Sequence, residues 1–247
     1  MTPPDYDKYR AQFAWHVVET EHCVFHVDAS LAEDVDIAEI INDAPARHAK
    51  IAALLKFDLN GIYGEKIHYW FFSRKILSLL GIDPGKKPFS TGQLTNAGID
   101  YVVANDRWNN HVQHVFHEEV HQLVMRETGE APALLNEGIA VYVESMVFHG
   151  KDEFRHLCAK TWKKHMKKDR LSQLIANEFF WSKYGKWPVY TLGAAVVHYL
   201  IETHGIDTLK DVCKATDYDD TQFCRLMEAK LGTTVDDLQR KITGFYR

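Results

Sequence analysis

The order of two periodic patterns along the chain restricts its fold more than any other feature. Short alternating or aromatic-rich runs that favour strands occur in the first part of the chain, at 17–18, 23–27, 66–72 and 99–104. Beyond Asn109, apolar residues recur at helical spacing. Strands followed by helices are typical of an α+β fold. We therefore expect a small N-terminal mixed β-sheet with helices, followed by a helical C-terminal half.

The N-terminal part also contains one helical pattern and one predicted loop. Apolar residues recur at helical spacing from Leu31 to Leu55, and Pro45 allows a kink there. The segment 81–98 is rich in Gly, Pro, Ser and Thr, which predicts a long loop. We expect a single domain over residues 1–247, with a β-rich lobe at 1–108 and a helical lobe at 109–247.

Charge and hydropathy exclude several classes of partner. The net charge of −5 does not favour binding to nucleic acid, whose binding proteins usually carry a basic excess. The longest apolar runs are well short of a membrane span, and residues 1–5 do not begin a signal peptide. We therefore expect a soluble, cytoplasmic protein that binds neither nucleic acid nor a membrane.

The four cysteines are irregularly spaced and none belongs to a C-x-x-C pair. Dense disulfide scaffolds and cysteine metal sites both need closer spacing. The sequence therefore predicts that Cys23, Cys158, Cys213 and Cys224 are reduced thiols.

Two histidines on one predicted helix carry the strongest chemical signal. The sequence H-E-E-V-H at 117–121 places His117 and His121 four residues apart, so their rings lie about 40° apart around a helix axis. Both rings can then reach one metal ion. Glu118 lies about 100° from His117, which suits a base for a metal-bound water better than a third ligand.

The ends of this helix are also indicated by the sequence. Asn109 or Asn110 is a suitable N-cap, and Gly129 follows Thr128 as a C-terminal glycine would. Between these ends, six apolar residues recur at helical spacing. A buried amphipathic helix of this kind would hold metal ligands rigidly.

A catalytic zinc site needs a third protein ligand, and Glu137 is the candidate. It follows Pro132, which can occupy the first turn of a second helix running to about Phe148. Because the link between the helices is short, we expect an antiparallel hairpin in which Glu137 faces the histidines. Glu144, further along the same helix, and Glu130 are the alternative ligands.

Other histidines and aromatic residues near these motifs admit simpler interpretations. His111 and His114 share the helical stripe of His117 and His121, but we expect them to form hydrogen bonds or to be exposed. The aromatic residues of 179–187 either pack in the core or line a pocket for apolar substrate side chains.

Taken together, these motifs resemble those of the gluzincins, in particular the peptidase-MA-like family, which is related to the alanyl/leucyl aminopeptidases. Gluzincins hold zinc with H-E-x-x-H and a downstream glutamate. N-E-G-I-A at 136–140 is similar to the family stretch that carries this glutamate, which would be Glu137. Y-T-L-G-A at 190–194 is similar to the family's Y-x-x-G-A stretch, whose tyrosine, here Tyr190, hydrogen-bonds the developing oxyanion. The resemblance covers the chain from about Ile99 to Gly205 and implies a zincin-like fold.

Two departures from the aminopeptidase branch narrow the resemblance. Fifteen residues separate His121 from Glu137, fewer than in aminopeptidases, and this favours the shorter peptidase-MA-like relatives. The G-x-M-E-N segment, whose glutamate binds the free amino group of the substrate, has no counterpart before 117–121. The resemblance therefore does not imply aminopeptidase specificity.

The resemblance implies a zinc metallopeptidase with one Zn²⁺ ion and a peptide or protein substrate. Glu118 would activate the water at the zinc ion, and Tyr190 would stabilise the oxyanion. The strand at 99–104 would pair with an extended substrate by edge addition. Two alternatives remain open, namely a catalytically silent protein that binds peptides in a regulatory role, and a zinc hydrolase of non-peptide amides or esters.

Overall fold

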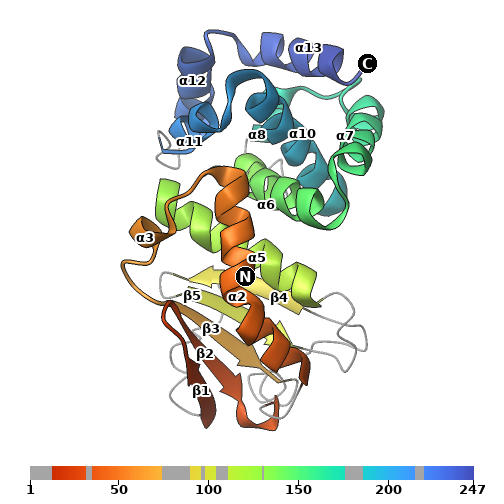
Figure 1. Ribbon diagram of the computed structural model, residues 1–247. Helices are drawn as coiled ribbons and strands as arrows, with labels where there is room; N and C mark the ends of the chain where they lie inside the picture. Colours follow the sequence, from red (N-terminus) through yellow and green to blue (C-terminus); the bar gives the residue numbers. More distant parts are fainter. Residues whose placement is uncertain are drawn as a thin grey trace. The chain divides into compact units, whose positions relative to one another are not determined.

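The computed structural model of the chain describes residues 13–31, 35–73, 90–95, 98–103, 111–129, 131–175, 186–214 and 220–247. Strands lie in the N-terminal part of the sequence, and the elements that follow residue 110 are helices (Figure 1). The predicted mixed α+β class is therefore confirmed.

Five strands form one mixed sheet. They are β1 (Trp15–Glu19), β2 (Cys23–Asp28), β3 (Ile67–Phe72), β4 (Ser90–Thr95) and β5 (Gly98–Val103), in the order β1-β2-β3-β5-β4 (Figure 1). β2, β3 and β5 are parallel neighbours, whereas β1 and β4 are antiparallel to the strands that they pair with. The buried side chains of β2 and β3 alternate along each strand, as in a half-buried sheet, and include Phe25, Tyr69 and Phe71.

Two expectations about the sheet were wrong. β4 lies within 81–98, where the sequence predicted a loop. Its composition, S-T-G-Q-L-T, is a weak strand signal, so the pairing with β5 rather than intrinsic propensity makes it a strand. β5 corresponds to the strand predicted at 99–104, but it lies between β3 and β4 and therefore has no open edge for a substrate.

Three of the described helical elements lie between β2 and β3 in the chain. The short η1 (Ala29–Leu31) precedes α2 (Val35–Leu55), and α3 (Leu59–Ile62) follows it. Pro45 lies inside α2, which nevertheless continues to Leu55. The buried residues of α2 recur three or four positions apart and comprise Ile37, Ile40, Ile41, Ala44, Arg47, His48, Ile51, Ala52 and Leu55.

Helices α5 (His111–Thr128) and α6 (Ala133–Phe148) end where local signals predicted. Gly129 terminates α5 with a φ of +80°, and its N–H donates to the carbonyl of Met125. Pro132 occupies the N-cap position of α6, where a missing N–H has no cost. The link between the two helices is therefore only a few residues long.

The remaining helices are α7 (Lys151–His165), α8 (Leu171–Ile175), α10 (Lys186–His204), α11 (Ile206–Lys214), α12 (Asp220–Leu231) and α13 (Val235–Phe245). α10 packs against α6, α7 and α11, and every residue from Thr191 to Leu200 is buried. A helix that is buried on all sides forms the centre of a helical core. In the part of the chain that the structure describes, no helix is both long and apolar enough to cross a lipid bilayer.

Internal contacts divide the chain into two compact units. The first comprises 1–49 and 59–122, and the second comprises 50–58 and 123–247. The division falls within α5, which is continuous, whereas the sequence placed the change of lobes before this helix, at residue 109. Each unit has a buried core of its own, around the sheet in the first and around α10 in the second.

None of the four cysteines is in a disulfide bond. Cys23, Cys158 and Cys213 are buried, and Cys224 is half-buried. Burial raises the pKa of Cys158 and of Cys213 to about 12, so both thiols stay protonated. The prediction of reduced thiols is confirmed.

Candidate metal centre

The three predicted ligands have ligand atoms close to one another. One such atom from each of His117, His121 and Glu137 lies within 4.8 Å of the other two. The Nε2 atoms of the two histidines are 3.1 Å apart, and their rings are nearly perpendicular, at 83°. Two ligand atoms that bind one tetrahedral zinc ion are about 3.4 Å apart, so the two histidine nitrogens need only a small adjustment to share one ion.

The donor set itself fits zinc. Two imidazole nitrogens and one carboxylate oxygen are a known catalytic combination, which leaves a fourth position for water. His121 is buried, whereas His117 and Glu137 are half-buried, so the group has access to solvent. Glu118, also half-buried, is not a member of the group, as its position on the helix predicted.

The other candidate ligands are not part of this group. Glu144 is among the described residues. It is buried on α6 and does not belong to the group of three ligands. Glu130 lies outside the described residues, as do the side chains of His111 and His114. Most of the aromatic segment 179–187 also lies outside them, so its predicted role in a pocket stays a prediction.

Sequence reasoning missed Glu119, the residue that follows the predicted base Glu118. Glu119 has no exposed side-chain surface and forms a bidentate ion pair with Arg47 of α2. The Nε and Nη2 atoms of Arg47 each lie 2.7 Å from one carboxylate oxygen. Glu119 lies about 160° from His121 around the helix, so the two side chains are on opposite sides of α5.

Further polar groups surround this ion pair. The Tyr69 hydroxyl donates to Oε1 of Glu119 at 3.0 Å, and His48 Nε2 lies 2.8 Å from the same hydroxyl. On its other side, His48 Nδ1 lies 2.6 Å from the Tyr63 hydroxyl. We call these five residues, Arg47, His48, Tyr63, Tyr69 and Glu119, the Glu119 network.

Burial and charge keep two members of the network, Tyr69 and Arg47, protonated. Burial raises the pKa of Tyr69 well above its ordinary value, and the negative charge of Glu119 raises it further, so the hydroxyl remains a donor. Burial lowers the pKa of Arg47, but attraction to Glu119 and the hydrogen bonds outweigh this effect and raise it overall. A sequence signal for the network existed, because Glu119 and Arg47 both interrupt apolar helical stripes.

Glu137 and Tyr190 are positioned by a different kind of contact. Gly138, the next residue after Glu137, lies against Gly193 of α10, three residues after Tyr190. A Cβ atom on Gly138 would lie 2.5 Å from the carbonyl carbon of Gly193, and one on Gly193 would lie 2.3 Å from the Leu134 oxygen. The glycines of both motif stretches are therefore needed for close helix packing.

Tyr190 lies near the start of α10 and is half-buried. The glycine contact brings its helix against the helix of Glu137, so the two predicted functional stretches share one packing interface. The role of the Tyr190 hydroxyl toward a substrate stays a prediction.

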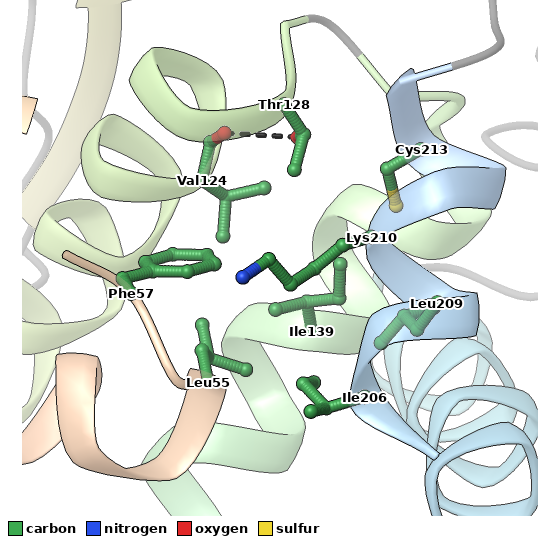
Figure 2. Close-up of a pocket in the computed structure, with 9 residues that line it drawn as sticks. All are labelled: Leu55, Phe57, Val124, Thr128, Ile139, Ile206, Leu209, Lys210 and Cys213. Atoms are coloured by element: carbon green, nitrogen blue, oxygen red, sulfur yellow. Dashed lines mark hydrogen bonds between the residues drawn. The ribbon is translucent and has the colours of Figure 1, made fainter. Parts of the chain in front are cut away.

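A small apolar cavity in the second unit has none of the three ligands in its lining (Figure 2). It measures about 10 Å³, room for about one water molecule, and is lined by Leu55, Phe57, Val124, Thr128, Ile139, Ile206, Leu209, Lys210 and Cys213. Lys210 reaches across it, donates to the Lys56 carbonyl at 3.0 Å and lies 5.3 Å from the centre of the Phe57 ring. The cavity is too small for a substrate.

Comparisons with known proteins do not identify a family for this chain. No model of a protein family matches the chain, and a search of curated proteins found no significant match. The resemblance to gluzincins therefore depends on the three motifs alone.

Proposed function

We propose that the protein is a zinc-dependent metallopeptidase of the gluzincin type, with a zincin-like arrangement of its catalytic helices. The observation that carries the proposal is the proximity of one ligand atom each from His117, His121 and Glu137. Two histidines and one glutamate at this spacing rarely come together by chance with a further carboxylate, Glu118, beside the first histidine.

When bound to these three residues, a zinc ion would polarise the scissile carbonyl and lower the pKa of a water molecule toward about 7. Glu118 accepts the proton of the attacking water and passes it to the leaving amine, as a general base and then a general acid. The Tyr190 hydroxyl donates a hydrogen bond to the carbonyl oxygen as negative charge develops on it. The substrate is a peptide or protein.

Metal analysis beside a digest of mixed peptides tests this proposal. Glu118→Gln should retain zinc and lose hydrolysis by about 10²–10⁴-fold, because an amide does not accept the proton. His117→Ala should lose both zinc and hydrolysis, because two ligands remain. Tyr190→Phe should retain zinc and lower kcat by about 10²–10³-fold.

Exposed residues of α7 provide matched controls. Glu153→Gln and His156→Ala make the same chemical changes on exposed positions and should keep both zinc and activity. Wild-type protein that binds no zinc would overturn the proposal. Stoichiometric zinc without any hydrolysis would favour the peptide-binding alternative, and cleavage of non-peptide amides or esters alone would favour the other zinc hydrolase.

A further inference from the structure

The Glu119 network has a defined direction. A carboxylate only accepts hydrogen bonds, so Tyr69 must donate to Glu119 and its oxygen is left to accept from Nε2–H of His48. In a neutral imidazole Nδ1 is then the acceptor, and the Tyr63 hydroxyl donates to it. From Tyr63 through His48 and Tyr69, each hydrogen bond is therefore donated toward Glu119.

The network joins α5 to two other elements of the first unit. Arg47 and His48 come from α2, Tyr69 comes from β3, and Glu119 is on α5. The two parallel bonds from Arg47 also restrict the angle of the carboxylate, because a guanidinium fork and a carboxylate match in one plane. A rotation of α5 about its axis would break several of these bonds at once.

Stability alone does not account for a buried network of this kind. Taking an ion pair out of water costs a large desolvation energy, and apolar residues of similar volume often serve as well or better. Apolar contacts, however, are non-directional and allow a helix to rotate or slide. What the charged and hydrogen-bonded groups add is orientation.

We propose that Arg47, His48 and Tyr69 are positioning residues for the metal centre, because through Glu119 they set the rotation of α5 that directs His117 and His121 to one ion. This inference rests on the proposed function. The anchor and the ligands lie on opposite faces of the same helix, only two residues apart in sequence, so a small rotation at Glu119 displaces both imidazoles. All three side chains are buried, so they act on the metal centre through Glu119.

The test compares the loss of the Tyr69 hydroxyl with the loss of a matched hydroxyl elsewhere in the chain. Tyr69→Phe deletes the donor to Glu119 and the acceptor for His48. Tyr246→Phe is the control, because its hydroxyl is also buried and lies 2.8 Å from a buried histidine, His198, in the second unit. Co²⁺ alone is the probe, since its affinity and its visible absorption both report on coordination geometry.

We expect both variants to unfold at a somewhat lower temperature than the wild type, because each loses a buried hydrogen bond. Tyr69→Phe alone should bind Co²⁺ about tenfold more weakly and with an altered visible spectrum. A folded Tyr69→Phe protein with the affinity and spectrum of the wild type overturns the inference. Wild-type protein that binds no Co²⁺ overturns the proposed function as well, so the two failures are distinguishable.

A second pair of variants covers the case in which Tyr69→Phe does not fold. His48→Gln keeps an N–H donor for Tyr69 and an acceptor for Tyr63, whereas His48→Leu keeps neither. Binding of Co²⁺ close to wild type in His48→Gln, but about tenfold weaker in folded His48→Leu, supports the inference. Equal binding in the two variants contradicts it.

Discussion

The two units hold their predicted functional residues by opposite means. In the first unit, α5 is anchored by a buried ion pair between Arg47 and Glu119 and by a hydrogen bond from Tyr69. In the second, α6 and α10 are held by direct contact between Gly138 and Gly193, where no side chain intervenes. One anchor is directional and electrostatic, and the other is steric.

The difference shows what each kind of anchor can specify. A steric contact sets the distance between two helices and fails if a single carbon atom is added. An ion pair with hydrogen bonds sets the angle of a helix and fails if one partner is removed, because the other charge is left buried. The first two predictions below each change one anchor, and the third concerns a buried histidine of α10, the helix that carries Gly193.

The largest effect is expected from removing one side of the ion pair. Glu119→Leu leaves the Arg47 guanidinium buried without its carboxylate and should cost about 3–5 kcal/mol of stability. Adding Arg47→Met to this variant should recover most of the loss, because no buried charge remains. Urea unfolding of the two single variants and the double variant measures the coupling.

A single Glu119→Leu variant within about 1 kcal/mol of the wild type would show that Arg47 readily finds water or another partner. The electrostatic description of the first anchor would then be wrong.

A somewhat smaller effect is expected at the glycine contact. The new methyl group of Gly138→Ala would lie 2.5 Å from backbone atoms of Gly193, so α6 and α10 must move apart, at a cost of about 2–3 kcal/mol. Gly244→Ala is the matched control, because a Cβ there meets no atom within 4 Å. The control should be neutral or stabilising by up to about 1 kcal/mol, since Ala favours helix more than Gly. Equal stability of both variants in urea would refute a steric anchor.

The smallest effect concerns His198, a buried polar residue of α10. The pKa of His198 is lowered to about 4, mainly by burial and also by the nearby charges of Arg155 and Lys151, while Glu202 opposes the shift. The unfolded chain, with an ordinary pKa of 6.5, therefore binds more protons than the folded chain between these two values. Stability from a neutral His198 is complete above pH 6.5 and is lost as the pH falls toward about 4.

We expect this contribution to be about 1–2 kcal/mol after allowance for solvent screening. Thermal unfolding of wild type and of His198→Phe at several pH values between about 4 and 6.5 measures it. The variant should depend less on pH over this range, and an unchanged pH dependence would contradict the prediction.

Local signals predicted much of the helical part. The end of α5 at Gly129 and the start of α6 after Pro132 depend on the backbone preferences of single residues, which act within one helical turn. The strand β4 was not predicted, because it exists through pairing with β5 and not through its own composition. The order of strands likewise placed β5 inside the sheet, where the sequence pattern had allowed an edge.

Within the candidate site, the residue types at 117–121 and the helical repeat were enough to place His117 and His121 on one face. Nothing in the spacing indicated Arg47 as the partner of Glu119, because these residues are 72 positions apart. The role of Gly138 was equally hidden, since the atoms that exclude a side chain there belong to another helix.

The amino-acid sequence by itself determined which residues are the candidate metal ligands, where the helices that carry them end, and that strands precede helices, because periodicity and capping act over a few neighbouring residues. Only the tertiary structure decided how α5 is oriented and how closely α6 approaches α10. Orientation and approach depend on partners that are distant in the chain, and these come together only when the core packs.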